Sequence, residues 1–99
     1  MNIEFILPAE QEFFEAIEYY NTESEALGYE FAAEVRSTLE RIIQYSDAWP
    51  SISARTRRCR TKRFPYSIIY QIRSEKILII AVMHMHRDPI RWKTRLNLM

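Results

Sequence analysis

The stretch that decides the fold is RTRRCRTKRFPYSIIYQIRSEKILIIAVMHMHRDP, which spans residues 55–89. It opens with a cationic run and continues into two apolar runs, Tyr66–Arg73 and Lys76–Met85. Short segments that are rich in Ile, Val and Tyr fit the pleated, half-buried surface of a sheet, so both runs predict β-strands. The link between them, Ser74-Glu75, indicates a tight hairpin.

Two features order these strands within a sheet. The cationic run, Arg55–Lys62, carries charges on both of its faces. That pattern predicts an edge strand, where cations also prevent pairing with other molecules. Lys76–Met85 is instead apolar at nearly every position, so we expect it to lie centrally with both faces covered. The three segments together predict a three-stranded antiparallel sheet.

The first half of the chain predicts a strand followed by two helices. Residues 2–7 begin with alternation and end apolar, which indicates a short strand. Apolar residues recur at helical spacing in Pro8–Ser24 and again in Tyr29–Asp47. The only glycine, Gly28, lies between these segments, and we expect it to adopt the left-handed conformation that ends the first helix. So short a link predicts an antiparallel helical hairpin.

Length and composition bound the class of protein. Ninety-nine residues, 47% hydrophobic and 27% charged, predict one globular domain over residues 1–99. No apolar run reaches the roughly 18–20 residues needed to span a bilayer. The first residues lack the basic start of a signal peptide, and the single cysteine, Cys59, cannot form an internal disulfide. These features favour a cytoplasmic protein without membrane contact.

Charge is distributed unevenly along the chain. Residues 1–50 carry eleven acids against two bases, whereas residues 51–99 carry twelve bases against two acids. The cationic half is expected to attract a polyanion or an acidic protein. The alternative is that the two halves neutralise each other across the fold.

The arginines of the cationic run are candidates for phosphate binding. Arg58 and Arg60 share one side of an extended chain, and a guanidinium group matches the geometry of phosphate oxygens. Aromatic residues on which nucleobases could stack are Tyr66, Tyr70 and Trp92. The pattern favours RNA or single-stranded nucleic acid, but an acidic protein would bind the same surface.

Two histidines, His84 and His86, are candidates for acid–base chemistry. They lie two positions apart, so on a strand their side chains point the same way. Either could transfer a proton near neutral pH, or both could simply hydrogen-bond the backbone. A zinc site needs further ligands, and only Cys59 and Asp88 are on offer. We therefore predict no metal and no other cofactor.

Three features of the chain resemble the RelE/ParE superfamily, the toxins of bacterial type II toxin–antitoxin modules. The first is RFPYSIIY at Arg63–Tyr70, and the second is HMHRDP at residues 84–89, followed by Trp92 and Arg95. The third is LGYEF at Leu27–Phe31, which opens the second helix. The resemblance implies an α+β fold of the microbial-ribonuclease type: an N-terminal strand, a helical hairpin and a three-stranded antiparallel sheet.

The resemblance implies two alternative activities. ParE-like members inhibit DNA gyrase by binding it, whereas RelE-like members cleave mRNA in the ribosomal A site. For a nuclease, the resemblance implies catalytic roles for Arg58, Arg60, Arg87 and His84. Ser67 stands where nuclease members carry an arginine, and Trp92 stands near the position where they often carry a tyrosine. These two departures favour the gyrase hypothesis over the nuclease hypothesis.

The resemblance also implies a partner, an acidic and partly disordered antitoxin. We expect a segment of it to fold onto the toxin, adding a helix or strand along the sheet and forming a hetero-oligomer. Residues expected to contact the antitoxin or the target are Arg63, Tyr66, Tyr70, His86, Trp92 and Arg95. A structural or general RNA-binding domain without effect on growth is the remaining hypothesis.

Overall fold

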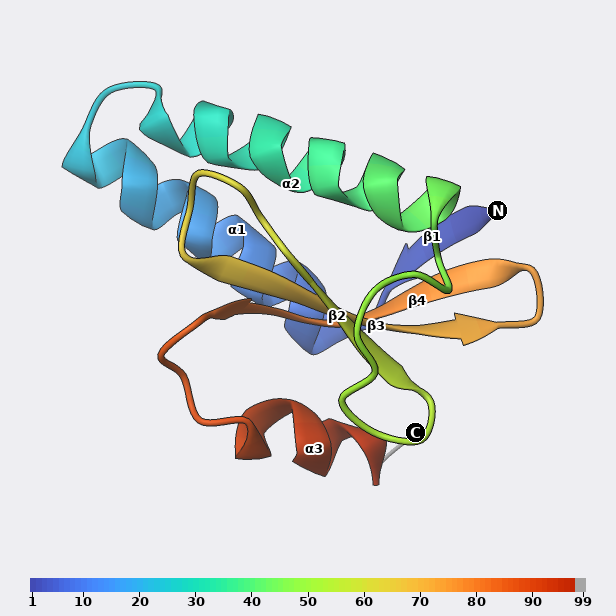
Figure 1. The fold of residues 1–99 in the computed structure, drawn as a ribbon. Coiled ribbons are helices and arrows are strands. Elements are labelled where there is room, and N and C mark those ends of the chain that lie inside the picture. Colours follow the sequence, from blue (N-terminus) through green and yellow to red (C-terminus); the bar gives the residue numbers. More distant parts are fainter. Residues whose placement is uncertain (98–99) are drawn as a thin grey trace.

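The structure, a computed structural model, describes residues 1–97 of the chain and has the predicted α+β architecture. Its elements are β1 (Asn2–Phe5), α1 (Leu7–Glu23), α2 (Leu27–Gln44), β2 (Thr56–Arg60), β3 (Tyr66–Arg73), β4 (Lys76–His84) and α3 (Ile90–Leu96). The strand, the helical hairpin and the three strands that follow occur in the expected order (Figure 1).

The four strands form one mixed sheet in the order β1-β4-β3-β2. β2, β3 and β4 are antiparallel as predicted, and β1 adds to the outer side of β4 in parallel. The cationic strand β2 lies at an edge, and β4 lies between β1 and β3, so both placements are confirmed. Residues 77–83 of β4 are all buried, because elements pack on both faces of the sheet.

Helices cover the two faces of the sheet unequally. α1 and α2 lie together against one face, and the short helix α3 lies against the other (Figure 1). On the first face, Phe31 and Ile42 of α2 pack with Ile68 and Ile79 of the sheet in the main core. The second face carries a smaller buried cluster made of Ile69, Leu78, Ile80, Ala81, Met83 and Trp92.

The link between the helices differs from the prediction for Gly28. The left-handed residue is Ala26, with φ of 65°, while Gly28 lies inside α2. A side chain at Gly28 would collide with α1, since a Cβ atom there would lie 2.6 Å from Asn21 Cγ and even closer to the Ile17 carbonyl. The Gly28 N–H also donates to Asn21 Oδ1 at 2.8 Å. The glycine therefore permits close helix packing rather than a change of chain direction.

The sequence analysis did not predict α3. Seven residues are too few to show helical periodicity, and the segment reads as a basic tail. A start signal is nevertheless present, because Asp88 Oδ1 accepts a hydrogen bond from the Ile90 N–H at 2.9 Å and Pro89 follows Asp88. Trp92 anchors the helix, with 5% of its surface exposed.

Candidate functional site

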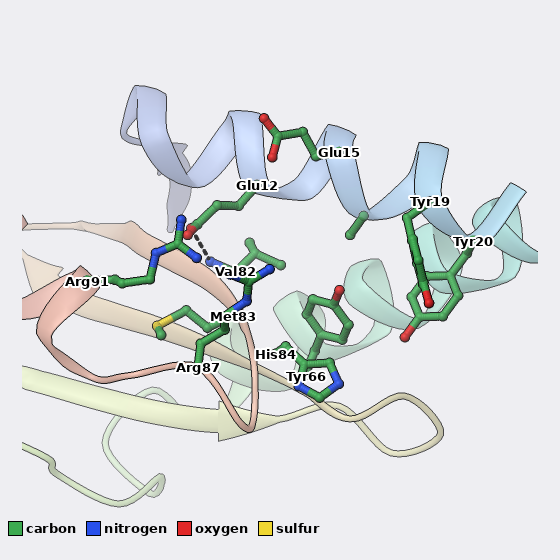
Figure 2. A pocket seen from close by; sticks show the side chains of 11 residues that line it. Glu12, Glu15, Tyr19, Tyr20, Tyr66, Val82, Met83, His84, Arg87 and Arg91 are labelled. Carbon is green, nitrogen blue, oxygen red and sulfur yellow. Dashed lines mark hydrogen bonds between the residues drawn. The ribbon is translucent and has the colours of Figure 1, made fainter. Parts of the chain in front are cut away.

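Two depressions meet at the C-terminal end of β4. We name the smaller one, of about 80 Å³, the cationic pocket; the side chains of Arg58, Arg60, Arg87 and His84 line it, beside Ser67 and Trp92. We name the larger one, of about 610 Å³, the β4 groove; it lies between α1 and the segment of residues 87–91 (Figure 2). Met83, His84 and Arg87 line both depressions.

Strand alternation places the arginines of the cationic pocket. On β2, Cys59 is buried in the main core, so Arg58 and Arg60 point to the opposite face of the sheet. Their register partners on β3 are Ile69 and Ser67. No hydrogen bond or ion pair of the guanidinium groups of Arg58, Arg60 or Arg87 is found within residues 1–97. Three cations without a carboxylate partner give the pocket the chemistry of an anion site.

The two histidines lie side by side, as the sequence predicted. Their ring centroids are 5.2 Å apart, and the His84 ring also packs edge-on against Tyr66 of β3 at 5.4 Å. His84 Nδ1 accepts a hydrogen bond from the backbone N–H of His86 at 3.1 Å. A neutral His84 ring in this arrangement carries its proton on Nε2, so it can donate a proton more readily than accept one.

Three residues predicted to contact a partner are instead built into the protein interior. Tyr70 is fully buried and its hydroxyl donates to the Ser46 carbonyl at 2.8 Å; burial raises the pKa of Tyr70 to about 12. Trp92 is buried beneath the sheet. Arg95 donates to Glu12 through both terminal nitrogens, at 2.8 and 2.7 Å. None of the three side chains is presented to a partner in this structure.

The acidic half of the chain neutralises only part of the cationic half. Arg63 pairs with Glu30 at 3.3 Å, and both side chains are solvent-exposed. Arg57 donates to the carbonyls of Asp47 and Trp49 at 3.0 and 2.7 Å. Such contacts leave the arginines of the cationic pocket unpaired, so the two alternatives for the charge asymmetry each describe one part of the molecule.

The β4 groove has an aromatic end and charged walls. Tyr19 and Tyr20 of α1 lie with their ring centroids 5.3 Å apart, and Tyr20 contacts Tyr66 across the groove at 6.1 Å. Burial, reinforced by the neighbouring Tyr66, raises the pKa of Tyr20 to about 12. Along the groove, the guanidinium groups of Arg87 and Arg91 lie on the side opposite α1 (Figure 2).

Glu12 is the residue of this region that sequence reasoning missed. Its carboxylate binds Arg95, and Oε1 also accepts the backbone N–H of Val82 at 3.1 Å (Figure 2). Arg95 in turn donates to the Ile80 carbonyl at 3.0 Å. The pair therefore joins α1, β4 and α3. Nothing in the sequence separates Glu12 from the ten other acids of the first half.

Two further properties concern the part of the chain that the structure describes. In residues 1–97, no group of three or more His, Cys, Asp and Glu side chains is placed to hold a metal ion. Over the same residues, none of the helices combines the length and the apolar character that a membrane crossing requires.

Comparisons with known proteins agree with this architecture. A family model described as the ParE toxin of type II toxin–antitoxin system, parDE, matches residues 3–89. Among solved structures, the chromosomal ParDE TA system from P. aeruginosa contains a similar chain, with 16% identity and a TM-score of 0.59 over 85% of this chain and 95% of that chain. A search of curated proteins found no match. Because the family model spans most of the sequence, the chain belongs to the ParE toxin family of type II toxin–antitoxin systems.

Proposed function

We propose that this ParE-family toxin arrests bacterial growth by binding DNA gyrase in the cytoplasm, and that an acidic antitoxin neutralises it. The match to the ParE family model over residues 3–89 carries the proposal. Within the superfamily that the sequence resembles, the ParE branch is the one that inhibits gyrase by binding. The proposed activity requires a complementary surface and no chemical step.

The residues of the cationic pocket support a binding function more strongly than a catalytic one. Ser67, which stands in place of an arginine of nuclease members, is buried and adds no charge. Trp92 is buried and has no hydroxyl group to exchange a proton. His84 has its Nδ1 engaged by the His86 N–H, which disfavours a role as general base.

A supercoiling assay tests the gyrase proposal. Purified toxin at micromolar concentration should block the supercoiling of relaxed plasmid by gyrase, and induction in cells should stall replication and produce filaments. The double variant Arg58→Glu/Arg60→Glu reverses two exposed charges of the pocket, and Arg36→Glu on the outer surface of α2 serves as the matched control. Undiminished supercoiling at micromolar wild-type toxin would reject the proposal.

A second candidate function is ribosome-dependent cleavage of mRNA. The observation that favours it is the convergence of Arg58, Arg60 and Arg87 around one pocket of about 80 Å³, with His84 at its rim. In such a cleavage the 2′-hydroxyl attacks the adjacent phosphorus, and cations aimed at the pentavalent intermediate stabilise its charge. Primer extension on mRNA from a translating extract should then reveal breaks within codons that Arg87→Ala abolishes. Intact transcripts would exclude this function.

A further inference from the structure

β4 extends beyond the strand that covers its outer edge. β1 pairs with β4 only from Lys76 to Ile79, and the Ile6 N–H adds a last backbone hydrogen bond to the Ile79 carbonyl at 3.1 Å. On its other side, β4 pairs with β3 as far as His84. Between Ile80 and His84, the outer edge of β4 therefore has no neighbouring strand within residues 1–97. An uncovered edge of this kind is a template for an added strand.

Some polar groups of this edge are already engaged. The Val82 N–H donates to Glu12, and the Ile80 carbonyl accepts a hydrogen bond from Arg95. The His84 carbonyl accepts the Arg87 N–H at 3.0 Å in the turn that follows β4. Because backbone groups alternate in direction along a ladder, the Val82 carbonyl and the His84 N–H point to the same open side. These two groups are free to receive a new strand.

The β4 groove lies directly over this edge. Val82 and Met83 form its floor, in a space of about 610 Å³ that accommodates a short extended peptide. Arg87 and Arg91 border it, and within residues 1–97 their guanidinium groups make no hydrogen bond or ion pair (Figure 2). The unpaired cations favour an acidic occupant, and the tyrosine rings at the other end favour an apolar side chain.

We propose that an extended segment of the acidic antitoxin binds in the β4 groove as an additional strand parallel to β4. One residue of the segment lies beside Met83, accepts the His84 N–H and donates to the Val82 carbonyl. A carboxylate of the segment pairs with Arg87 and Arg91, and an apolar side chain packs against Tyr19. The inference rests on the antitoxin part of the proposed function and is independent of the gyrase part.

The engaged groups determine the direction of the added strand. A residue of a parallel strand bonds to the carbonyl and the N–H of two residues that flank its neighbour, here Val82 and His84. An antiparallel strand would require both backbone groups of the same residue. It would displace either Glu12 from Val82 or the Arg87 N–H from His84. Only the parallel arrangement leaves every existing hydrogen bond intact.

Charge reversal tests the groove in the complete toxin–antitoxin pair. The full-length toxin is titrated with its cognate antitoxin by calorimetry, as wild type and as the double variant Arg87→Glu/Arg91→Glu. We expect the variant to bind at least about tenfold more weakly, since two favourable pairs become repulsive. The double variant Arg36→Glu/Arg73→Glu makes the same change of charge outside the groove and should keep its affinity within about twofold.

A second pair of variants tests the aromatic end. Tyr19→Ala removes an exposed ring that lines the groove, whereas Tyr29→Ala removes an equally exposed ring outside it. We expect only Tyr19→Ala to weaken antitoxin binding, by about tenfold. Circular dichroism checks that each variant is folded. Equal affinities for the two variants would argue against the placement of an apolar side chain at this end.

Hydrogen exchange reports on the added strand itself. On binding of the antitoxin, exchange at the His84 amide should slow at least about tenfold, because that N–H acquires a backbone acceptor. An unchanged His84 rate, or an unchanged affinity in Arg87→Glu/Arg91→Glu, overturns the inference. So does a variant that loses gyrase inhibition while its antitoxin affinity is intact, since the groove would then serve the target. If wild-type toxin leaves gyrase unaffected but the variants still lose antitoxin binding, the gyrase proposal fails and the groove inference stands.

Discussion

On one face of the sheet, α1 and α2 bury a continuous cluster of aromatic and aliphatic residues, whereas the other face is covered only by the seven residues of α3. Phe31 shows the depth of the first face, since its ring packs within 4.8–6.2 Å of four other aromatic rings. On the second face α3 is too short to cover the end of β4, and there the arginines meet. The thick face stabilises the fold, and the thin face leaves room for a partner.

Charge follows the same division. Glutamates of the helical hairpin reach only the cations near the hairpin itself, as in the pairs Arg63–Glu30 and Arg95–Glu12. Arg58 and Arg60 point to the opposite face, out of reach of those carboxylates. The sheet therefore acts as a barrier between the acidic half of the chain and three of its cations, which keeps an anion site open.

Substitution in the thick face should have the largest effect on stability. Phe31 is 0% exposed, and Phe31→Ala should lower the free energy of unfolding by about 3–5 kcal/mol, through lost burial and the cavity left behind. Phe14, on the outer side of the hairpin, is 54% exposed, so Phe14→Ala should cost less than about 1 kcal/mol. Urea unfolding measures both. Similar losses would show that the hairpin face is not the main source of stability.

The two ion pairs of β4 should differ in their contribution to stability. Arg95 and Glu12 are only 14% and 15% exposed, so Arg95→Ala strands a carboxylate in a poorly solvated site and should cost about 3 kcal/mol. Lys76 pairs with Glu4 on the surface, and Lys76→Ala should cost less than about 1 kcal/mol. Thermal and urea unfolding compare the two variants. A loss for Arg95→Ala as small as that for Lys76→Ala would mean that α3 is not anchored through Glu12.

Alkaline pH should destabilise the thick face through its buried phenols. The pKa of Tyr70 is raised from 10.0 to about 12 by burial, so the folded state holds its proton more tightly than the unfolded state. That contribution is complete below pH 10 and is lost as the pH rises from about 10 to about 12. Tyr70 alone accounts for about 2–3 kcal/mol of the loss. Tyr70→Phe should flatten the stability curve above pH 10, measured by urea unfolding; an unaltered slope would contradict the assignment.

Much of the fold was predictable because each element carries a local signal. The alternation of Tyr66–Arg73, the apolar run of Lys76–Met85 and the helical stripes of the first half gave the strand and helix order that the structure has. α3 was missed because its seven residues are held by one long-range anchor, Trp92, rather than by a periodic pattern. The role of Gly28 was misread because it depends on where α1 and α2 cross.

The site was predictable only in part, because residue type does not reveal depth. Arg58, Arg60, Arg87 and His84 do line one pocket. Tyr66 and Tyr70 look equivalent in the sequence, yet Tyr66 lies at the end of β3 and borders the groove, while Tyr70 lies beneath the helical hairpin. Glu12 acquires its importance solely from long-range contacts with β4 and α3, which no local pattern encodes.

The hairpin link offers a smaller test of the thick face. Gly28→Ala would push a Cβ atom into Asn21 and the Ile17 carbonyl, so it should cost about 1–3 kcal/mol by overpacking. Ala26→Gly changes the residue that has the left-handed conformation and should be within about 1 kcal/mol of neutral, since the relief of strain offsets the added freedom of the unfolded chain. Urea unfolding distinguishes the two. A neutral Gly28→Ala would show that the two helices can separate at no cost.

The thin face should show the smallest effect on stability. Arg58 and Arg60 line the cationic pocket without a carboxylate beside them, so replacing either by alanine removes no ion pair. We expect Arg58→Ala and Arg60→Ala to change the free energy of unfolding by less than about 0.5 kcal/mol, and relief of repulsion among the three cations could make the change slightly stabilising. Urea unfolding at low and at high salt measures this. A loss above about 1 kcal/mol in either variant would mean that these arginines hold the fold together, and the division between a stabilising face and a binding face would then fail.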